Sequence, residues 1–351
     1  MYMRNNIIWI LSFLTFVIYG QQQIDRTLLY DGNDREYILY IPANYQESQT
    51  APLLFHLHGG NGYAQEWISA SNMRSIADTA GCILVYPQAL ADPNDEGSLN
   101  WIHKDPTDHD DIYFIESIID ELSSEYMIDE SRIYACGYSL GGEFTFELLC
   151  RLNNRIAAGA AVARTMQTYT YNNCSPEHPT ALMTILGTDD YVSPYEGLSW
   201  NGELFYVSAD DMHLYWAEFN NTELNPIVVD VPNTNISDGT TVQRKTWANG
   251  TNCVSVEELK VNGGGHDWPG VFGNMDIDSD QEIWNFVSKH NINGLIDCNT
   301  NSSIEEIEKD RLCVKTINVL GQVSKKHSRN IVFHIYSDGS VEKQNLLKSI
   351  Y

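Results

Sequence analysis

Short, almost continuous apolar runs recur along the chain and alternate with stretches of helical periodicity. The runs lie at residues 52–57, 82–87, 132–138, 157–163 and 181–187, and each has the length of a strand buried on both faces. Between two of them, Ile115, Ile118, Ile119 and Leu122 fall on one helical face. This alternation predicts a mostly parallel sheet with helices on both faces, an α/β architecture.

Other segments extend this pattern at both ends. Asp31-Gly32-Asn33 between two β-rich runs predicts a hairpin, and a helix is expected from about Ala64 to Thr79. From Tyr195 to about Lys245 the alternation weakens into a polar insertion that contains aromatic residues. A last strand ending at Gly263-Gly264-Gly265-His266 and a closing helix from about Asp280 complete the predicted domain.

The two termini differ from the centre. Residues 7–19 form an uncharged apolar run after Arg4, too short to span a bilayer comfortably, so residues 1–20 are expected to be a cleaved signal peptide. Gly20 suits the cleavage site, but Ile18 is large for its position, which leaves an uncleaved anchor as the alternative. A polar linker follows Cys298, and the tail beyond it reads as all-β. We therefore expect a signal peptide at residues 1–20, an α/β domain at 21–298, and a linker with a β-rich tail at 299–351.

The amino-acid composition limits which binding partners we expect for this protein. The 351 residues contain 21 basic and 47 acidic side chains, for a formal charge of −26. Such a charge repels nucleic acid, anionic membranes and polyanionic substrates. We expect neither nucleic-acid binding nor stable membrane insertion.

The chain contains seven cysteines, which can form lasting disulfides if the protein is exported from the cytosol. Cys82 and Cys136 lie inside apolar runs and are expected to be buried thiols. The remaining positions at element ends suggest the pairs Cys150–Cys174 and Cys253–Cys298. No CxxC pair appears, so neither a structural zinc site nor a thioredoxin-type motif is supported.

A candidate nucleophile lies between a predicted strand and a predicted helix. Gly137-Tyr138-Ser139-Leu140-Gly141 is a G-x-S-x-G pentapeptide, in which small residues permit a sharp, strained turn. A serine nucleophile needs a histidine base and a carboxylate, which in this fold follow in the order Ser, Asp, His. Asp189 or Asp190, after one strand, and His266, after the last, satisfy that order, and spacing alone does not choose between the aspartates. The three glycines before His266 are expected to leave room for substrate.

The run from Leu57 to Gly62 offers backbone N–H groups for an oxyanion. Gly60 and Asn61 are the candidate donors here, together with the N–H of Leu140. His58 is expected to pin this loop by hydrogen bonding.

Aromatic side chains near the motifs are candidate substrate contacts. These are Trp268, Trp101 and Tyr138, with core packing as the alternative for both tryptophans. Asp276, Asp278 and Asp280 resemble the start of a calcium loop, but Gln281 stands where that loop needs glycine. Capping of the closing helix is the better interpretation, and no metal site is predicted.

The motifs together resemble the polyhydroxybutyrate depolymerase family of esterases, which overlaps the feruloyl and acetylxylan esterases of carbohydrate esterase family one. The resemblance covers roughly residues 25 to 290 and is carried by "REYILYIP", "LHGG", "SRIYACGYSLGG", "GTDDYVSPY" and "GGGHDWPG". It implies an α/β-hydrolase fold, ester hydrolysis without metal or cofactor, and Asp190 as the acid. Cys136 and Ser193 depart from the family pattern.

The tail resembles the C-terminal sorting domain of type IX secretion substrates, through "INVLGQ" and "IYSDGSVEK". This implies the type IX machinery as a partner, followed by release or attachment at the cell surface. The resulting hypothesis is a secreted serine esterase acting on feruloyl or acetyl esters of polysaccharides, or on short-chain polyesters. The alternatives are a catalytically silent carbohydrate-binding protein and a serine peptidase of the same fold.

Overall fold

The computed structural model describes residues 20–92, 97–101, 110–298, 313–318, 332–336 and 341–344. The predicted signal peptide falls outside these residues except for Gly20, as does most of the predicted linker. The chain divides into two compact units, residues 1–298 and 299–351.

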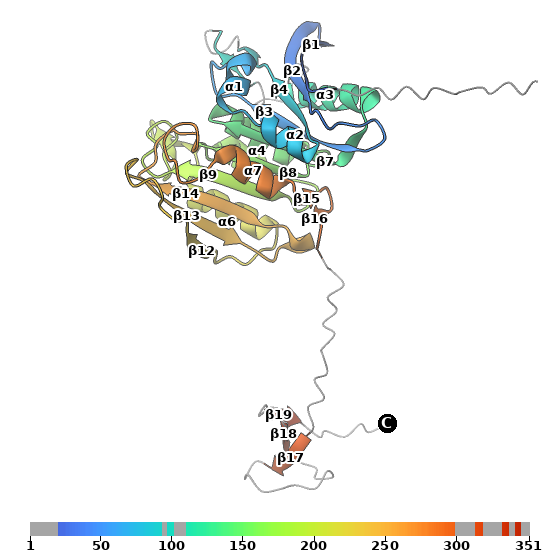
Figure 1. Ribbon diagram of the computed structural model, residues 1–351. Helices are drawn as coiled ribbons and strands as arrows, with labels where there is room; N and C mark the ends of the chain where they lie inside the picture. The colour runs from blue at the N-terminus through green and yellow to red at the C-terminus, as the bar shows by residue number, and fades with distance from the viewer. Residues whose placement is uncertain are drawn as a thin grey trace, which may run out of the picture. The chain divides into compact units, whose positions relative to one another are not determined.

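A ten-stranded sheet forms the centre of the first unit (Figure 1). Its strands, in order across the sheet, are β1 (Gln22–Tyr30), β2 (Asn33–Ile41), β4 (Ile83–Pro87), β3 (Ala51–Leu57), β7 (Ile128–Tyr138), β8 (Ala158–Val162), β9 (Ala181–Gly187), β14 (Val256–Asn262), β13 (Thr241–Trp247) and β12 (Ile227–Asp230). The six strands from β4 to β14 are parallel, and two antiparallel strands flank them at each end. The predicted parallel centre is therefore confirmed, and the carboxyl ends of its strands meet at one edge.

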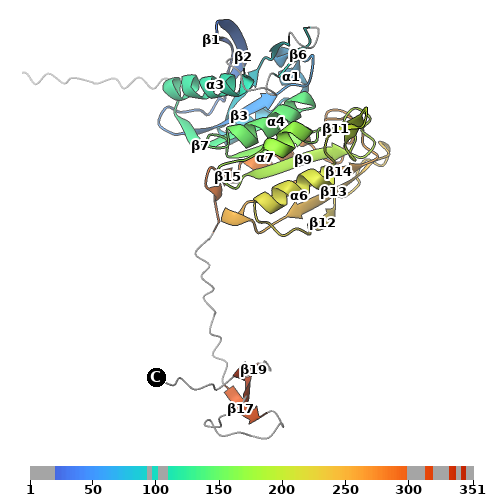
Figure 2. The same cartoon turned by 180° about the vertical axis from the view of Figure 1, so that it is seen from behind.

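Helices cover both faces of this sheet. The helices α1 (Ala64–Ala70), α2 (Arg74–Ala80) and α7 (Ser279–Val287) contribute to one buried layer (Figure 1). On the other face lie α3 (Asp111–Glu125), α4 (Leu140–Arg151) and α6 (Ala209–Phe219) (Figure 2). Because strand side chains alternate between faces, Phe55 packs into the second layer while its neighbour Leu54 packs into the first.

The first unit also contains several shorter elements. They are the hairpins β5 (Leu90–Ala91) with β6 (Leu99–Asn100), β10 (Leu198–Trp200) with β11 (Glu203–Tyr206), and β15 (His290–Asn291) with β16 (Gly294–Leu295), the helix α5 (Thr168–Asn173) and the 3-10 turn η1 (Thr251–Cys253). None of the helices in the described ranges is both long and apolar enough to cross a membrane.

Local chemistry explains several predicted features. The β1–β2 hairpin turns at Asp31 and Gly32, both with positive φ, as the sequence predicts. The expected disulfides Cys150–Cys174 and Cys253–Cys298 are both present, and Cys82 and Cys136 are buried free thiols.

One prediction was wrong in part. The helix expected from Ala64 to Thr79 is two helices, because Ser71 adopts extended backbone angles and turns its hydroxyl into the interior. The polar insertion supplies the regular elements α6, β12 and β13, and the last two extend the sheet beyond β14. β13 reads as polar because much of it is only partly buried.

The second unit contains the strands β17 (Cys313–Asn318), β18 (Val332–Tyr336) and β19 (Val341–Gln344). They pair antiparallel in chain order to form a three-stranded sheet. The described part of this unit is therefore β-structured.

Candidate active site

Ser139 occupies a sharp turn between β7 and α4. Its φ of 53° and ψ of −118° are strained for a residue with a side chain. A Cβ on Gly137 would lie 2.3 Å from the carbonyl of Gly141, and a Cβ on Gly141 would lie 2.3 Å from the backbone oxygen of Leu57. Both glycines are therefore sterically required, and the turn holds the Ser139 side chain at the carboxyl edge of the sheet.

His266 and Asp190 complete a continuous row of hydrogen bonds with Ser139. The Ser139 Oγ lies 2.9 Å from His266 Nε2, and His266 Nδ1 lies 2.7 Å from Asp190 Oδ2. Asp190 is buried, and its Oδ1 accepts the backbone N–H groups of Val192 and Ser193, at 2.8 Å each. A carboxylate that accepts from Nδ1–H leaves Nε2 free to accept the serine proton.

The structure places Asp190, and not Asp189, against His266. Asp189 is exposed, and its carboxylate accepts the Thr188 hydroxyl. Its backbone N–H donates to the carbonyl of Gly264, 2.8 Å away, so Asp189 joins the two loops through its main chain.

Glycines shape the packing of the loop that carries His266. We call residues 263–268 the histidine loop. A Cβ on Gly187, at the end of β9, would lie 2.3 Å from the Gly264 oxygen and 2.4 Å from that of Gly265. The missing side chain at Gly187 therefore lets the histidine loop pack directly against residues 187–193, which we call the Asp190 loop, and Gly263 has a positive φ of 76° that favours glycine.

A loop that includes two candidate oxyanion donors borders Ser139. We call residues 58–64 the oxyanion loop. A Cβ on Gly59 would lie 3.4 Å from the Ser139 Cβ, and one on Gly60 would lie 2.6 Å from the Leu140 side chain. Leu140 begins α4, where backbone N–H groups have no intrahelical acceptor. Gly60 and Leu140 therefore lie side by side next to the serine.

Asn61 does not fit the predicted donor role. Its backbone N–H donates to the carbonyl of Leu99, 2.7 Å away, and its side-chain oxygen accepts the Leu99 N–H at 3.1 Å. The β5–β6 hairpin therefore uses the polar groups of Asn61 to fix the loop.

His58 pins the loop, as the sequence predicts. Its Nε2 lies 3.1 Å from the backbone N–H of Ala89 and accepts from it, so the ring proton is on Nδ1, which donates to the Gly59 carbonyl at 2.7 Å. Burial lowers the pKa of His58 to about 4, which keeps the ring neutral at physiological pH.

The two predicted tryptophan contacts are interior residues. Trp268 and Trp101 have exposed fractions of 0% and 1%, because each indole is packed against other rings and donates its N–H internally. Trp101 Nε1 donates to the carbonyl of His58 at 2.9 Å, and Trp268 Nε1 donates to Asp280 at 3.1 Å. Neither offers a surface to a ligand in this structure, so core packing, the alternative interpretation, describes both.

Tyr138 lies next to the active-site candidate His266. Its hydroxyl donates to the backbone oxygen of His266 at 2.7 Å, and its ring contacts those of His266 and Phe272. Burial raises the pKa of the Tyr138 hydroxyl, with Asp190 as a further cause, so it remains a donor. Tyr138 therefore fixes the backbone of the catalytic candidate His266.

A buried polar chain lies behind the histidine loop. Trp67 Nε1 donates to His56 Nδ1 at 2.7 Å, so His56 carries its proton on Nε2 and donates it to Ser71 Oγ at 2.7 Å. The Ser71 hydroxyl in turn donates to Asp280 at 2.5 Å. Burial raises the pKa of Asp280 to about 6 and lowers that of His56 to about 3. The sequence offered no local signal for this chain, because its members come from β3, from α1 with its C-cap Ser71, and from α7, which are far apart in the sequence.

The sequence motifs also did not single out two exposed aromatic residues near the site. Phe272 packs edge-on against Tyr138, with ring centres 5.9 Å apart, and remains 38% exposed. Tyr191 follows Asp190 directly and is 87% exposed. Their positions next to the predicted motifs were the available signal.

Of the three aspartates expected to cap the closing helix, only Asp278 caps α7, while Asp276 and Asp280 accept from other parts of the chain. Asp278 is the N-cap and accepts the N–H of Gln281, while Asp276 accepts those of Thr234 and Asn235. Among the described residues, no group of three or more His, Cys, Asp or Glu side chains is arranged to hold a metal ion.

Known proteins similar to this chain are esterases, although no family model matches it. It is 27% identical over 270 residues, 77% of its length, to a bifunctional acetylxylan esterase/xylanase of Neocallimastix patriciarum. It is also 27% identical over 248 residues, 66% of its length, to feruloyl esterase B of Piromyces equi. The chain spans only 35% and 42% of the lengths of these two relatives.

Among solved structures, an acetyl xylan esterase from Aspergillus awamori superposes with a TM-score of 0.54 at 13% identity. The superposition covers 77% of this chain and 99% of that one. At this identity the likeness concerns the fold alone. The first unit has an α/β-hydrolase fold.

Proposed function

We propose that this protein is a secreted serine esterase that hydrolyses carboxylic esters through an acyl-enzyme. The observation that supports this most strongly is the unbroken row of hydrogen bonds from Ser139 through His266 to Asp190. The esterase activity in the names of both relatives agrees with it.

Acylation begins when Ser139 Oγ attacks the ester carbonyl carbon and His266 Nε2 takes the hydroxyl proton. The carbonyl oxygen becomes an oxyanion, which accepts from the backbone N–H groups of Leu140 and Gly60. When this intermediate collapses, the bond to the alcohol oxygen breaks and His266 returns the proton to the leaving alcohol.

Deacylation repeats these steps with water as the nucleophile. His266 takes a proton from the water, whose oxygen attacks the acyl carbon, and then returns a proton to Ser139 Oγ as the free acid leaves. Asp190 holds the tautomer of His266 throughout and stabilises the imidazolium that forms.

Substrates are proposed to be feruloyl or acetyl esters of polysaccharides, with short-chain polyesters such as polyhydroxybutyrate as a further candidate. The names of the two relatives support the first group. The partly exposed ring of Phe272, packed on Tyr138, supports an aromatic acyl group, because a flat apolar ring stacks well on such a surface.

The test is hydrolysis by the purified full chain of methyl ferulate, acetylated xylan and a hydroxybutyrate oligomer. Ser139→Ala is the test variant, and Ser124→Ala, an exposed serine at the end of α3, is the matched control. Hydrolysis of at least one substrate, lost by about a thousandfold or more only in Ser139→Ala, is the expected result.

Two alternatives predict different results. A silent carbohydrate-binding protein would hydrolyse none of the substrates and would leave Ser139 unlabelled by a fluorophosphonate probe. A peptidase would be labelled at Ser139, would cleave peptides and would spare the three esters.

Export is the second part of the proposal. The signal-like run in residues 1–20 and the two disulfides support a compartment outside the cytosol, where such bonds persist. The likeness of residues 299–351 to a sorting domain supports the type IX machinery as the exporter, with release or surface attachment afterwards. Expression with and without residues 299–351 in a type IX host tests this: the full chain should reach the medium or cell surface and the shortened chain should stay in the periplasm.

A further inference from the structure

Gln88 connects the two ends of the oxyanion loop, although the mechanism above gives it no role. Its side chain Oε1 accepts the backbone N–H of Ala64 at 2.8 Å. Its Nε2 faces the carbonyl of Gly62 at 3.3 Å, His58 Nε2 at 3.2 Å and the carbonyl of Ala89 at 3.1 Å, so two N–H hydrogens are shared among three acceptors. The N–H of Ala64 fixes the orientation of the amide, because only the oxygen can accept from it.

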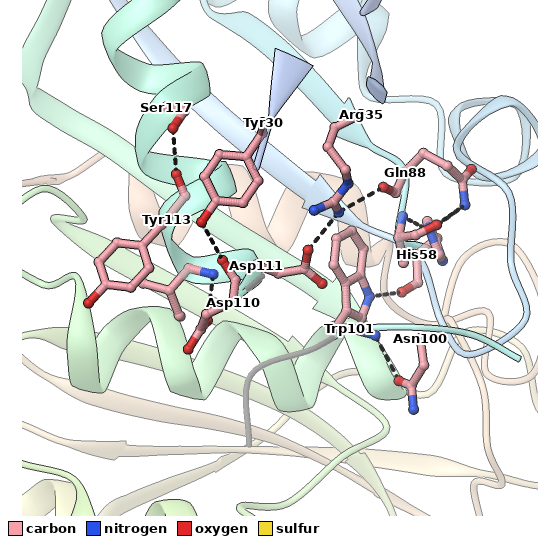
Figure 3. Close-up of polar contacts among 12 residues, drawn as sticks. Tyr30, Arg35, His58, Gln88, Asn100, Trp101, Asp110, Asp111, Tyr113 and Ser117 are labelled. Carbon is pink, nitrogen blue, oxygen red and sulfur yellow. Dashed lines mark hydrogen bonds and ion pairs between the residues drawn. The ribbon is translucent and has the colours of Figure 1, made fainter. Parts of the chain in front are cut away.

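The backbone of Gln88 is held from the opposite side. Its N–H donates to the Glu36 carbonyl at 2.9 Å, and its carbonyl accepts from Arg35 Nη2 at 3.3 Å. Figure 3 shows the Arg35 guanidinium between Gln88 and Asp111, with the Gln88 amide turned toward His58.

Arg35 is itself fixed by a buried ion pair. Its Nη2 lies 2.6 Å from Asp111 Oδ1, and the two side chains are 1% and 0% exposed. The guanidinium also lies over the Phe114 ring, 3.8 Å from its centre. A buried pair of this kind is strongly destabilising to break, so it provides a rigid base for Gln88.

We propose that Gln88 is a positioning residue for ester hydrolysis, which holds the oxyanion loop so that the Gly60 N–H points at the developing oxyanion. This inference rests on the proposed function. Oxyanion donors must lie within about 2.7–3.1 Å of the oxygen to be effective. A displacement of the order of 1 Å can lower a catalytic rate about a hundredfold. One amide that holds His58 at the start of the loop and Ala64 at its end therefore controls the rate without touching the substrate.

A purely structural role for Gln88 makes a different prediction. It would lower stability and leave the chemistry of the folded enzyme unchanged, whereas a positioning role weakens binding of the transition state more than that of the substrate. Trifluoromethyl ketones separate the two, because Ser139 Oγ adds to the ketone carbon, its proton passes to His266 and the ketone oxygen becomes an oxyanion.

The test compares the wild-type full chain with Gln88→Met and Gln88→Glu. Methionine keeps the length of the side chain but removes every side-chain hydrogen bond, while glutamate keeps the acceptor for Ala64 and loses the donors. Gln65→Met is the matched control, since Gln65 is an exposed glutamine on the adjoining helix α1. For each protein we would measure kcat and KM on the best ester, the inhibition constant of an aryl trifluoromethyl ketone, and the thermal midpoint.

The expected result is a fall in kcat of about 30- to 100-fold in Gln88→Met, with KM within about threefold of wild type. The inhibition constant should rise by the same factor as kcat/KM falls, and Gln65→Met should match wild type. Gln88→Glu should show the same pattern, so it carries the test if the methionine variant does not fold.

Three results would overturn the inference. An active wild type with folded Gln88 variants that keep kcat within threefold would leave the proposed function standing and remove the role of Gln88. An inhibition constant that stays unchanged while the thermal midpoint falls would make Gln88 purely structural. A wild type that neither hydrolyses any ester nor reacts with a fluorophosphonate would overturn the proposed function, and the inference with it.

Discussion

The oxyanion loop and the histidine loop both border Ser139, yet they are held in place by different means. Each follows a parallel strand, β3 or β14, and each involves a buried tryptophan: Trp101 contacts the oxyanion loop and Trp268 belongs to the histidine loop. The histidine loop packs main chain against main chain on the Asp190 loop, with Gly187 at the contact. The oxyanion loop is fixed by its own His58 side chain, which accepts the Ala89 N–H, and by Gln88 and Trp101 from elsewhere in the chain.

Because of this difference, local sequence patterns predict the histidine loop better than they predict the supports of the oxyanion loop. Glycine runs and the order of Ser, Asp and His mark the histidine loop within a few residues. The supports of the oxyanion loop come from the ends of β4 and β6, about thirty and forty residues away. The predictions that follow test the two loops separately.

The largest effect is expected at the acid that orients His266. Asp190→Asn should lower kcat by about 10³- to 10⁴-fold at neutral pH, because an amide no longer selects the required tautomer. Asp189→Asn is the matched control and should keep most of the activity, since its carboxylate is exposed and accepts the Thr188 hydroxyl. Steady-state kinetics on the best ester measures both, and equal losses in the two variants would contradict the assignment.

The next effect concerns the contact between the histidine loop and the Asp190 loop. Gly187→Ala should lower the free energy of unfolding by on the order of 2–4 kcal/mol, because the added Cβ would meet the Gly264 and Gly265 oxygens. Gly265→Ala should cost much less, since its Cβ would meet only the Asp267 carboxylate, at an ordinary 3.4 Å. Urea denaturation followed by tryptophan fluorescence would show this, and similar midpoints for the two variants would refute the tight contact.

Asp280, behind the histidine loop, should make stability depend on pH. Burial raises its pKa to about 6 in the folded state, from an ordinary value of 3.8. The contribution of this group to stability is therefore fully present below pH 3.8 and is lost as the pH rises through about 6.

Asp280→Asn keeps an acceptor for Ser71 and Trp268 but cannot ionise. It should therefore be more stable than wild type at pH 8, by on the order of 2–3 kcal/mol, and similar to it at pH 3.5. Asp278→Asn, an exposed cap on the same helix, should show no such dependence. Thermal midpoints at the two pH values would decide, and a difference that does not change with pH would show that Asp280 does not titrate in this range.

The smallest effect is expected for one support of the oxyanion loop. Trp101→Phe removes the N–H that donates to the His58 carbonyl but keeps the packing on Phe144. One lost hydrogen bond is worth about 1 kcal/mol, so kcat should fall roughly fivefold while the other supports hold the loop. A hundredfold loss would mean that Trp101, and not Gln88, is the main support.

Much of the fold could be predicted because its signals are local. Continuous apolar runs indicated the parallel strands, and Asp31-Gly32 indicated the first hairpin. The two disulfides were inferred from cysteines at element ends. The proximity of Ser139, Asp190 and His266 followed from their places after parallel strands, whose carboxyl ends share one edge.

The rest depends on long-range contacts that no local pattern reports. β13 lies toward the edge of the sheet, and the sequence placed it in a polar insertion and not in the sheet because much of it is only partly buried. The helix break at Ser71 depends on Asp280, 209 residues away. The burial of Trp268 has the same cause: an indole can line a pocket or fill a core, and only the tertiary partners decide.

The central claim is that Ser139 is an activated nucleophile, and covalent labelling tests it most directly. The full chain would be treated with a fluorophosphonate and the modified residue located by peptide mass spectrometry, with Ser139→Ala in parallel. The account predicts one adduct, on Ser139, whose rate of formation falls sharply in Asp190→Asn but not in Asp189→Asn. Esterase activity without an adduct on Ser139, or equal labelling of the Ser139→Ala protein, would contradict it.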